Sequence, residues 1–307
     1  MAHRLRLGSR QSALALKQAD IVKAALLKEN PNLDIEIVGI STQGDDDKTS
    51  PLSEIGGKGV FIKTLEVALL NNDIDIAVHS LKDVTSYSPD ELTLSGFLNP
   101  EAIEDVVIAP PESGITSLES LPQNATIGTG SLRRRALLKA LRPDLKTIEL
   151  RGNIETRIDK CFSGECDAIL LSKVGLVRMG WKSKIRETLD PFMFVPAPGQ
   201  GVIALQSRKG DALSESYAEM ISDPHQSIIS RQEMHILAEL GLDCRFPFGL
   251  YTEFDGNRFA LTAFWADMAY KKRKKETIHF HKKDQSYAVE DLIKTIKTDF
   301  EAWGVYG

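Results

Sequence analysis

Short apolar runs and amphipathic stretches follow one another in a repeated order along the first two hundred residues. Residues 5–7 predict a strand, residues 8–12 a turn, and residues 13–28 a helix whose apolar side chains recur near a 3.6-residue period. The same order returns later, with a strand at 125–129, a turn at Gly130-Ser131 and a helix at 132–141. The helix is closed by Arg142-Pro143, because the residue before a proline disfavours helical geometry.

A second matched pair strengthens this reading. Residues 73–82 and 165–173 both predict buried strands that lead into a serine and a lysine, Ser80 with Lys82 and Ser172 with Lys173. The paired similarities occur in the same order, so we expect two similarly built α/β domains, at 1–99 and 100–200. The Pro- and Gly-rich segment 191–201 predicts a crossing, after which residues 201–222 return to the first domain.

The last third of the chain has a different pattern. It predicts a helix from about residue 228 to 241, strands at 249–254 and 258–265, and a final helix at 286–303. Asp255-Gly256-Asn257 is typical of a hairpin turn. Residues 223–307 are therefore expected to form a small α+β domain, with the basic run 271–275 as a solvated hairpin tip.

Composition narrows the class of protein. The chain has 307 residues, 42% of them hydrophobic, and a net charge of -5, which argues against a broad surface for nucleic acid or anionic membrane. It has no apolar run long enough to span a membrane, and its three cysteines fit a reducing compartment. Cys161 and Cys166 lack the partners of a zinc site, and no metal is expected. We expect a soluble, cytoplasmic protein.

Arginines gather at the second strand-to-helix turn. Arg133, Arg134 and Arg135 fall in the first turn of a helix, where the positive end of the dipole disfavours cations, and Arg151 and Arg157 follow closely. An anion would relieve this cost, and Arg grips carboxylates and phosphates through two hydrogen bonds. The hydroxyls at Ser9, Ser12, Thr129 and Ser131 either bind an anion or only cap helices; two similar turns favour binding.

Three further motifs leave alternatives open. Gly56-Gly57-Lys58-Gly59 lacks the spacing of a nucleotide P-loop, so Lys58 either meets a carboxylate or lies in an ordinary turn. His79-Ser80-Leu81-Lys82-Asp83 ends an apolar strand, where α/β folds place their sites; Asp83 there either stabilises a cation and moves protons or only caps a helix. Cys244 lies in a loop that a ligand could reach, although a lone cysteine is more often a buried apolar group.

Taken together, six motifs in order resemble the porphobilinogen deaminase (hydroxymethylbilane synthase) family. They are Ser9-Arg10-Gln11-Ser12, Gly56-Gly57-Lys58-Gly59, Asp75 to Asp83, Gly128 to Arg134, Leu150-Arg151-Gly152-Asn153 and Pro198-Gly199-Gln200-Gly201. Each motif alone is weak, but their order over some two hundred residues is specific, and Cys244 falls where the family carries its cofactor cysteine.

The resemblance implies two domains like those of periplasmic binding proteins and a third that carries a dipyrromethane through a thioether to Cys244. Such monomeric enzymes join four porphobilinogen molecules into hydroxymethylbilane with loss of four ammonia molecules, in the cleft between the first two domains. Asp83 would be the catalytic acid, assisted by Lys82, and the one anionic group in a cationic cleft. Carboxylates and rings of cofactor and substrate would be held by Arg10, Ser12, Lys58, Lys82, Asp83, Thr129, Ser131, Arg133, Arg134, Arg151, Gly152, Arg157, Arg178 and Gln200.

The chain departs from the family pattern at three places. Leu242-Asp243 replaces the usual Gly-Gly before the cysteine, and a carboxylate there should raise the thiol pKa and slow cofactor loading. Val84-Thr85 stands where the family commonly has a proline, and residues 100–105 replace an Arg/Asp-rich stretch, so hinge contacts should differ. Two other functions compete: a two-lobed polycarboxylate-binding protein without turnover, and a DNA-associated effector-domain protein, which the absent helix-turn-helix domain disfavours.

Overall fold

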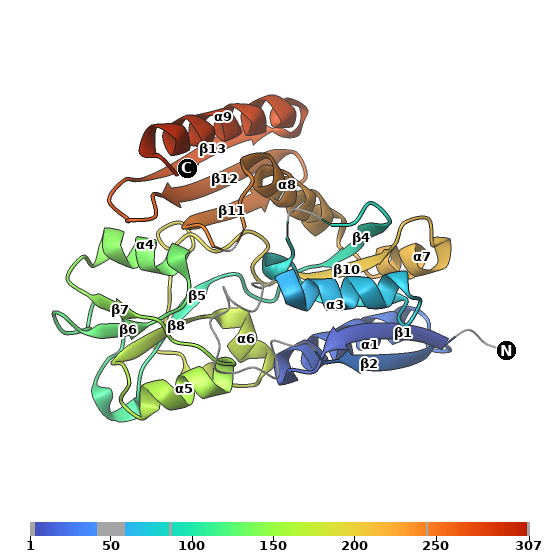
Figure 1. Cartoon of the computed structure of the whole chain (residues 1–307), viewed down its shortest axis with the longest axis horizontal. Coiled ribbons are helices and arrows are strands. Elements are labelled where there is room, and N and C mark those ends of the chain that lie inside the picture. Colours follow the sequence, from blue (N-terminus) through green and yellow to red (C-terminus); the bar gives the residue numbers. More distant parts are fainter. Residues whose placement is uncertain (1–3, 42–58, 86–87, 244, 306–307) are drawn as a thin grey trace. The chain divides into compact units, whose positions relative to one another are not determined.

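The computed structural model describes residues 4–41, 59–85, 88–243 and 245–305 and divides them between two compact units. The first unit comprises residues 1–100 and 201–230, and the second comprises 101–200 and 231–307. The chain therefore crosses to the second unit, returns to the first at residue 201, and crosses again within one helix. Figure 1 shows the elements of each unit.

The first unit is built on one five-stranded sheet in the order β2-β1-β3-β10-β4. Its strands are β1 (Arg4–Arg10), β2 (Asp34–Ile40), β3 (Ile76–Ser80), β4 (Leu92–Leu98) and β10 (Ile203–Arg208). Strands β1, β2 and β3 are parallel, whereas β10 runs antiparallel to both of its neighbours. The helices of this unit are α1 (Ala13–Glu29), α3 (Gly59–Leu70), α7 (Ala212–Met220) and the first part of α8 (Pro224–Leu240).

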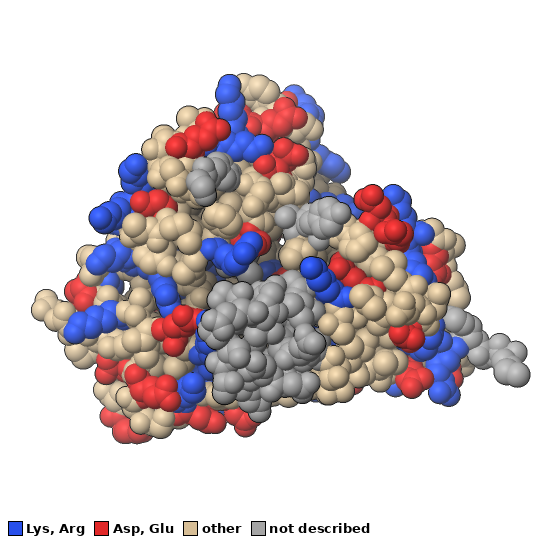
Figure 2. Space-filling model, viewed as in Figure 1, with Lys and Arg blue, Asp and Glu red and all other residues tan. Residues whose placement is uncertain are grey.

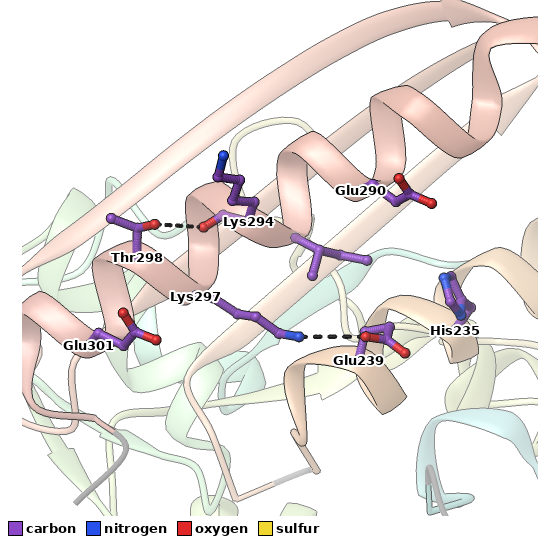
Figure 3. A pocket seen from close by; sticks show the side chains of 8 residues that line it. His235, Glu239, Glu290, Lys294, Lys297, Thr298 and Glu301 are labelled. Atoms are coloured by element: carbon purple, nitrogen blue, oxygen red, sulfur yellow. Dashed lines mark hydrogen bonds and ion pairs between the residues drawn. The ribbon is translucent and has the colours of Figure 1, made fainter.

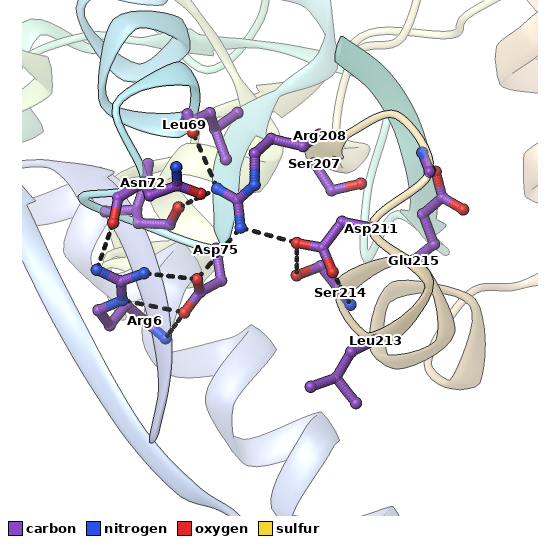
Figure 4. A network of polar contacts seen from close by, with 12 residues as sticks. Arg6, Leu69, Asn72, Asp75, Ser207, Arg208, Asp211, Leu213, Ser214 and Glu215 are labelled. Carbon is purple, nitrogen blue, oxygen red and sulfur yellow. Dashed lines mark hydrogen bonds and ion pairs between the residues drawn. The ribbon is translucent and has the colours of Figure 1, made fainter. Parts of the chain in front are cut away.

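A polar network fastens the returning strand to the first sheet. Asp75, which is 2% exposed, accepts from Arg6 Nη2 at 2.7 Å and from Arg208 Nη2 at 3.4 Å. Arg208 also donates to Asp211 at 2.7 Å, before α7 (Figure 4). Burial raises the pKa of Asp75, but the hydrogen bonds and charge of Arg6 outweigh it and hold that pKa below its usual value. The network lies where β3 begins, at the opposite end from Lys82 and Asp83.

The second unit repeats this sheet. Its order is β7-β6-β8-β5-β9, with three parallel strands followed by an antiparallel one. The strands are β5 (Asp105–Ile108), β6 (Thr126–Gly128), β7 (Lys146–Ile148), β8 (Ala168–Ser172) and β9 (Glu187–Thr188). The helices that accompany them are α4 (Leu132–Leu141), α5 (Ile154–Phe162) and α6 (Lys173–Arg178). The prediction of two similarly built α/β halves is confirmed, and the antiparallel strand of each sheet is the one next to a crossing.

A three-stranded sheet and a long helix complete the second unit. The antiparallel strands β11 (Phe248–Phe254), β12 (Arg258–Ala266) and β13 (Arg273–His281) are followed by α9 (Gln285–Trp303). Phe264 of β12 shares one buried cluster with Leu137 of α4 and Val195. This contact explains why residues 231–307 group with 101–200. The predicted division into three domains, 1–99 with 201–222, 100–200 and 223–307, stays a prediction.

Several boundaries differ from the sequence expectation. Strand β1 extends from Arg4 to Arg10, so residues 8–10, which were expected in a turn, belong to the strand. Helix α8 begins at Pro224, four residues before the predicted start, because Asp223 Oδ1 accepts from the Gln226 backbone N–H at 2.7 Å and proline suits the first helical position. The basic run 271–275 extends past the hairpin tip into β13, which is an edge strand. Lysines on an edge strand discourage pairing with another chain. On the face drawn in Figure 2, basic and acidic side chains are interspersed.

Candidate functional site

In the first unit, Lys82 and Asp83 lie in a short 3-10 turn, Leu81–Asp83, directly after β3. Leu81 is 1% exposed and its backbone N–H donates to Val202 at 3.0 Å, so the turn is anchored beside β10. Lys82 and Asp83 remain half-buried at the carboxyl end of a parallel strand, which is where α/β sheets carry their sites. The predicted position of this pair in the fold is therefore found.

Arg10 and Ser12 belong to the same edge of this sheet. Arg10 ends β1, and β1 runs parallel to β3 with Gly8 opposite Ala77, so the two strands end together. Ser12 caps α1 by accepting from the Ala15 backbone N–H at 3.4 Å. The structure thus brings Arg10, Ser12, Lys82 and Asp83 to one edge. Lys58, also predicted for the site, lies outside the described residues.

In the second unit, two side chains of the arginine-rich turn bind a buried acid that sequence reasoning missed. Arg133 and Arg134 are 4% and 7% exposed, and both bind the carboxylate of Asp105, which is fully buried at the start of β5. Arg134 Nη2 lies 2.7 Å from Asp105 Oδ1, and Arg133 Nη2 lies 2.8 Å from Oδ2. Gln200 adds a third donor at 3.0 Å from Oδ1.

The opposite charges of Asp105 and its two arginines stabilise one another. Burial raises the pKa of Asp105, but the charges and hydrogen bonds of Arg133 and Arg134 outweigh it and hold that pKa far below its usual range. The anion that the arginine-rich turn was expected to need is therefore supplied, for these two side chains, by the chain itself. That they also hold carboxylates of a ligand stays a prediction. The sequence did carry a signal for this pair, because Asp105 begins an apolar strand. A charged residue is buried at such a position only when it has a partner of opposite charge.

The hydroxyls and remaining arginine of this turn organise the start of α4. Ser131 Oγ accepts from the Arg134 backbone N–H at 3.4 Å, and Thr129 Oγ1 accepts from the Ser131 N–H at 3.2 Å. Arg135 turns back to donate to the Thr129 carbonyl at 3.0 Å. The capping interpretation is correct for Ser131; whether it also binds an anion is untested.

The loop after β7 presents the more exposed arginines. Arg151 pairs with Glu149, and their side chains are 41% and 50% exposed. Gly152 has a φ of 116°, and a Cβ there would lie 2.7 Å from Thr156, so only glycine fits. Its carbonyl accepts from Arg157 Nε at 2.7 Å. Since β6 and β7 are parallel, this loop and the arginine-rich turn both follow carboxyl ends of neighbouring strands.

Arg178, at the end of α6, is buried and paired with an acid from the stretch that departs from the family pattern. Its Nε lies 3.2 Å from Glu101, whose side chain is 50% exposed. Burial lowers the pKa of Arg178, and Glu101 opposes that shift. The neighbouring Glu104 binds Lys173 at 2.7 Å. The acidic replacements in residues 100–105 therefore neutralise cations of α6, a relationship that spacing alone did not reveal.

The helix and loop that precede the predicted cofactor cysteine are described, whereas Cys244 itself lies outside the described residues. Leu242 is 1% exposed, which anchors the loop, and Asp243 Oδ2 accepts from Arg245 Nε at 2.8 Å. Asp243 thus has a cationic partner in Arg245.

A second buried acid, Glu233 of α8, was also missed by sequence reasoning. It accepts from the backbone N–H of Gly199, in the crossing segment, at 2.7 Å. Burial raises the pKa of Glu233 to about 7, more than this hydrogen bond lowers it. The acid joins α8 to the segment that also carries Gln200.

Other polar groups lie apart from the predicted residues. A groove between α8 and α9 is lined by His235, Glu239, Glu290, Lys294, Lys297 and Glu301, with Lys297 3.5 Å from Glu239 (Figure 3). Cys161 and Cys166 are both buried thiols. Within the described part of the chain, no cluster of three or more His, Cys, Asp or Glu could hold a metal ion, and no helix is long and apolar enough to cross a membrane.

The family model and the curated relatives agree on one family. Residues 5–216 match the family model described as porphobilinogen deaminase, dipyromethane cofactor binding domain. The porphobilinogen deaminase of Nitrobacter winogradskyi is 43% identical over 254 residues, which are 82% of this chain and 79% of that protein. That of Geobacter sulfurreducens is 38% identical over 276 residues, 90% and 86% of the two chains.

Among solved structures, the periplasmic VFT2 domain of BvgS from Bordetella pertussis has a TM-score of 0.43 and 18% identity, covering 74% of this chain and 92% of that one. The order of motifs found from the sequence, the repeated α/β sheets and the extent of the family match lead to one conclusion. This chain belongs to the porphobilinogen deaminase family.

Proposed function

We propose that this protein polymerises four porphobilinogen molecules into linear hydroxymethylbilane, with release of four ammonia molecules, in tetrapyrrole biosynthesis. The family membership carries this proposal, and the placement of Asp83 at a strand end supports it. The proposal includes a covalent dipyrromethane on Cys244 and a monomeric protein in the cytoplasm. It assigns Asp83 as the catalytic acid, with Lys82 beside it.

The donor set of the second unit fits a dipyrromethane. That group carries acetate and propionate arms, so it needs cations and N–H or O–H donors rather than an apolar pocket. Arg151 is exposed at its loop, Arg157 is half-buried, and the capped N-terminus of α4 adds a positive dipole end. Arg133 and Arg134 share the single carboxylate of Asp105, so one positive charge is left over and contributes a positive potential to the site.

When bound, the dipyrromethane supplies the free pyrrole α-carbon that attacks the first substrate. The chain's own residues would do the rest. As the aminomethyl C–N bond of porphobilinogen breaks and ammonia leaves, the substrate becomes a cation, and the Asp83 carboxylate would stabilise it and accept the pyrrole N–H hydrogen bond. After the C–C bond forms, the α-carbon of the attacking ring must lose its proton, and Asp83 is the group assigned to accept it.

The arginines would bind the carboxylates that accumulate as the chain grows. Arg10 and Ser12 lie at the same sheet edge as Asp83, and Thr129, Ser131, Gly152 and Gln200 accompany the arginines of the second unit. Arg178 is held by Glu101, so a substrate carboxylate there would have to displace or share that pair. For this reason we expect a lower turnover rate than in an enzyme without Glu101.

Intact-mass spectrometry of the purified protein tests the proposal most directly. A mass excess equal to one dipyrromethane, mapped to the peptide with Cys244 and absent from Cys244→Ser, is expected, together with consumption of porphobilinogen. An unmodified chain that forms no hydroxymethylbilane would overturn the enzyme and favour a polycarboxylate-binding protein. Light scattering of the same sample measures its molar mass and so tests the expected monomer. Binding of duplex DNA at physiological salt would instead support the DNA-associated effector-domain protein.

A further inference from the structure

A buried polar network in the first unit ties together four segments around the Lys82-Asp83 turn. Glu66 of α3 and His79 of β3 are each 6% exposed, and Gln206 of β10 is fully buried. The Gln206 amide nitrogen donates to Glu66 Oε1 at 3.1 Å and to Ser88 Oγ at 2.7 Å. Ser88 donates to the same Glu66 oxygen at 2.9 Å, and Gln206 Oε1 lies 3.0 Å from His79 Nε2.

The direction of these hydrogen bonds determines the tautomer of His79. Both N–H groups of Gln206 are used by Glu66 and Ser88, so only its carbonyl oxygen faces His79. A carbonyl oxygen can only accept, and therefore Nε2 must carry the proton. Burial lowers the pKa of His79 to about 4, more than Gln206 and the charge of Asp83 raise it, so the ring is neutral at pH 7 with a bare Nδ1.

The network holds both ends of the turn that carries Asp83. His79 lies four residues before Asp83, Ser88 lies five residues after it, and both bind the same amide of Gln206. Gln206 belongs to β10, in which Ala204 lies opposite His79. Gln206 is two residues further along β10, so its side chain is on the same face of the sheet as His79. Among the described residues, Asp83 on the turn is the charged group that acts on this ring, and Glu66 on α3 is joined to the ring through the Gln206 amide.

We propose that Gln206 is a positioning residue: it holds His79 as the Nε2–H tautomer and, through His79 and Ser88, fixes the turn that presents Asp83. This inference rests on the proposed function for the role of Asp83, but the hydrogen-bond pattern itself does not. In this role Gln206 and His79 do not act on substrate; they determine the position of the Asp83 side chain.

Nitrogen-15 NMR of histidine-labelled protein tests the network without any substrate. The chain has six histidines, and the His79 signals are those lost in His79→Asn. The wild type is expected to show a protonated Nε2 and a bare Nδ1 unchanged from pH 8 to pH 5.5. A proton on Nδ1, or titration near the ordinary histidine pKa, would overturn the tautomer assignment.

Turnover of three variants tests the positioning role. Gln206→Met keeps the length of the side chain but removes its hydrogen bonds, so the tautomer preference should be lost and kcat should fall by about tenfold or more with KM little changed. Gln206→Glu keeps an acceptor for Nε2–H but replaces the donor to Glu66 and Ser88 by a second acid, so it should keep the proton on Nε2 and raise the His79 pKa. Ser207→Ala is the matched control, because Ser207 is equally buried on β10 but bonds to Ser95 at 3.0 Å instead.

Full turnover in Gln206→Met, or an equal loss in Ser207→Ala, would contradict the proposal. If Gln206→Met does not fold, Gln206→Glu alone decides, since loss of the Nε2 proton in that variant contradicts the pattern. A wild type that is inactive on porphobilinogen would overturn the proposed function and the positioning role together, while the NMR result would still decide the tautomer.

Discussion

The Asp105 carboxylate lies 2.7 Å from the guanidinium of Arg134, and neither side chain is more than 8% exposed. Arg133 binds the other oxygen of the same carboxylate. Two buried cations thus depend on one buried anion, so the folding free energy of the second unit should depend on the charge of Asp105.

Asp105→Asn should destabilise the second unit by about 3–5 kcal/mol, because it leaves two buried guanidiniums without an anion. The depressed pKa of Asp105 makes this contribution complete above pH ~4, where the unfolded carboxyl is ionised, and it is lost as pH falls toward the folded-state pKa. Urea unfolding at pH 7 and at pH 3 measures both effects. Asp34→Asn, which breaks an exposed pair with Arg4, should leave the urea midpoint almost unchanged at both pH values.

Glu233→Gln should stabilise the protein above neutral pH. The folded-state pKa of Glu233 is raised to about 7, so its carboxyl is neutral in both states below pH ~4.5, and stability is lost as pH rises from there through 7. Glutamine keeps the acceptor for Gly199 and cannot ionise, so the gain over wild type should grow from near zero at pH 4.5 to about 3 kcal/mol at pH 8. A pH-independent difference would contradict the buried acid. Glu239→Gln, on the exposed side of α8, is the control.

Asp83→Asn should leave the fold intact and lower turnover by at least about a hundredfold, since the amide cannot stabilise a cation or accept a proton. Porphobilinogen consumption and circular dichroism measure the two properties. Asp90→Asn changes an exposed acid in the same segment and should be neutral. Retained activity in Asp83→Ala would refute the assigned role.

Arg151→Gln should separate function from stability. The side chain is 41% exposed, so the unfolding free energy should change by less than about 1 kcal/mol, while elongation or cofactor assembly stalls. Glu149→Gln breaks the same pair but keeps the cation, and it should retain activity. Mass spectrometry of enzyme incubated with porphobilinogen identifies the stalled species. Arg133→Gln should lose stability as well, because that guanidinium is buried against Asp105.

The local pattern of the sequence was sufficient to predict most elements and the family. The helix at 132–141 was predicted with the bounds that α4 has, because Ser131 caps its start and Pro143 follows its end. The place of Asp83 after a strand also followed from local order. Arg10 was expected in a turn and instead ends β1, but it lies at the same edge, since parallel strands put their carboxyl ends on one edge.

Only the tertiary structure decided which charges meet. Asp105 and Arg134 are 29 residues apart, and Gln206 and His79 are 127 apart, so no periodicity joins them. These pairs form because β5 and β10 enter their sheets antiparallel beside strands that are distant in sequence. A buried charge or amide must then find its partner in that sheet, since water cannot reach it there. The sequence determined the family and the reactive groups, and the packing of distant strands decided how those groups are held.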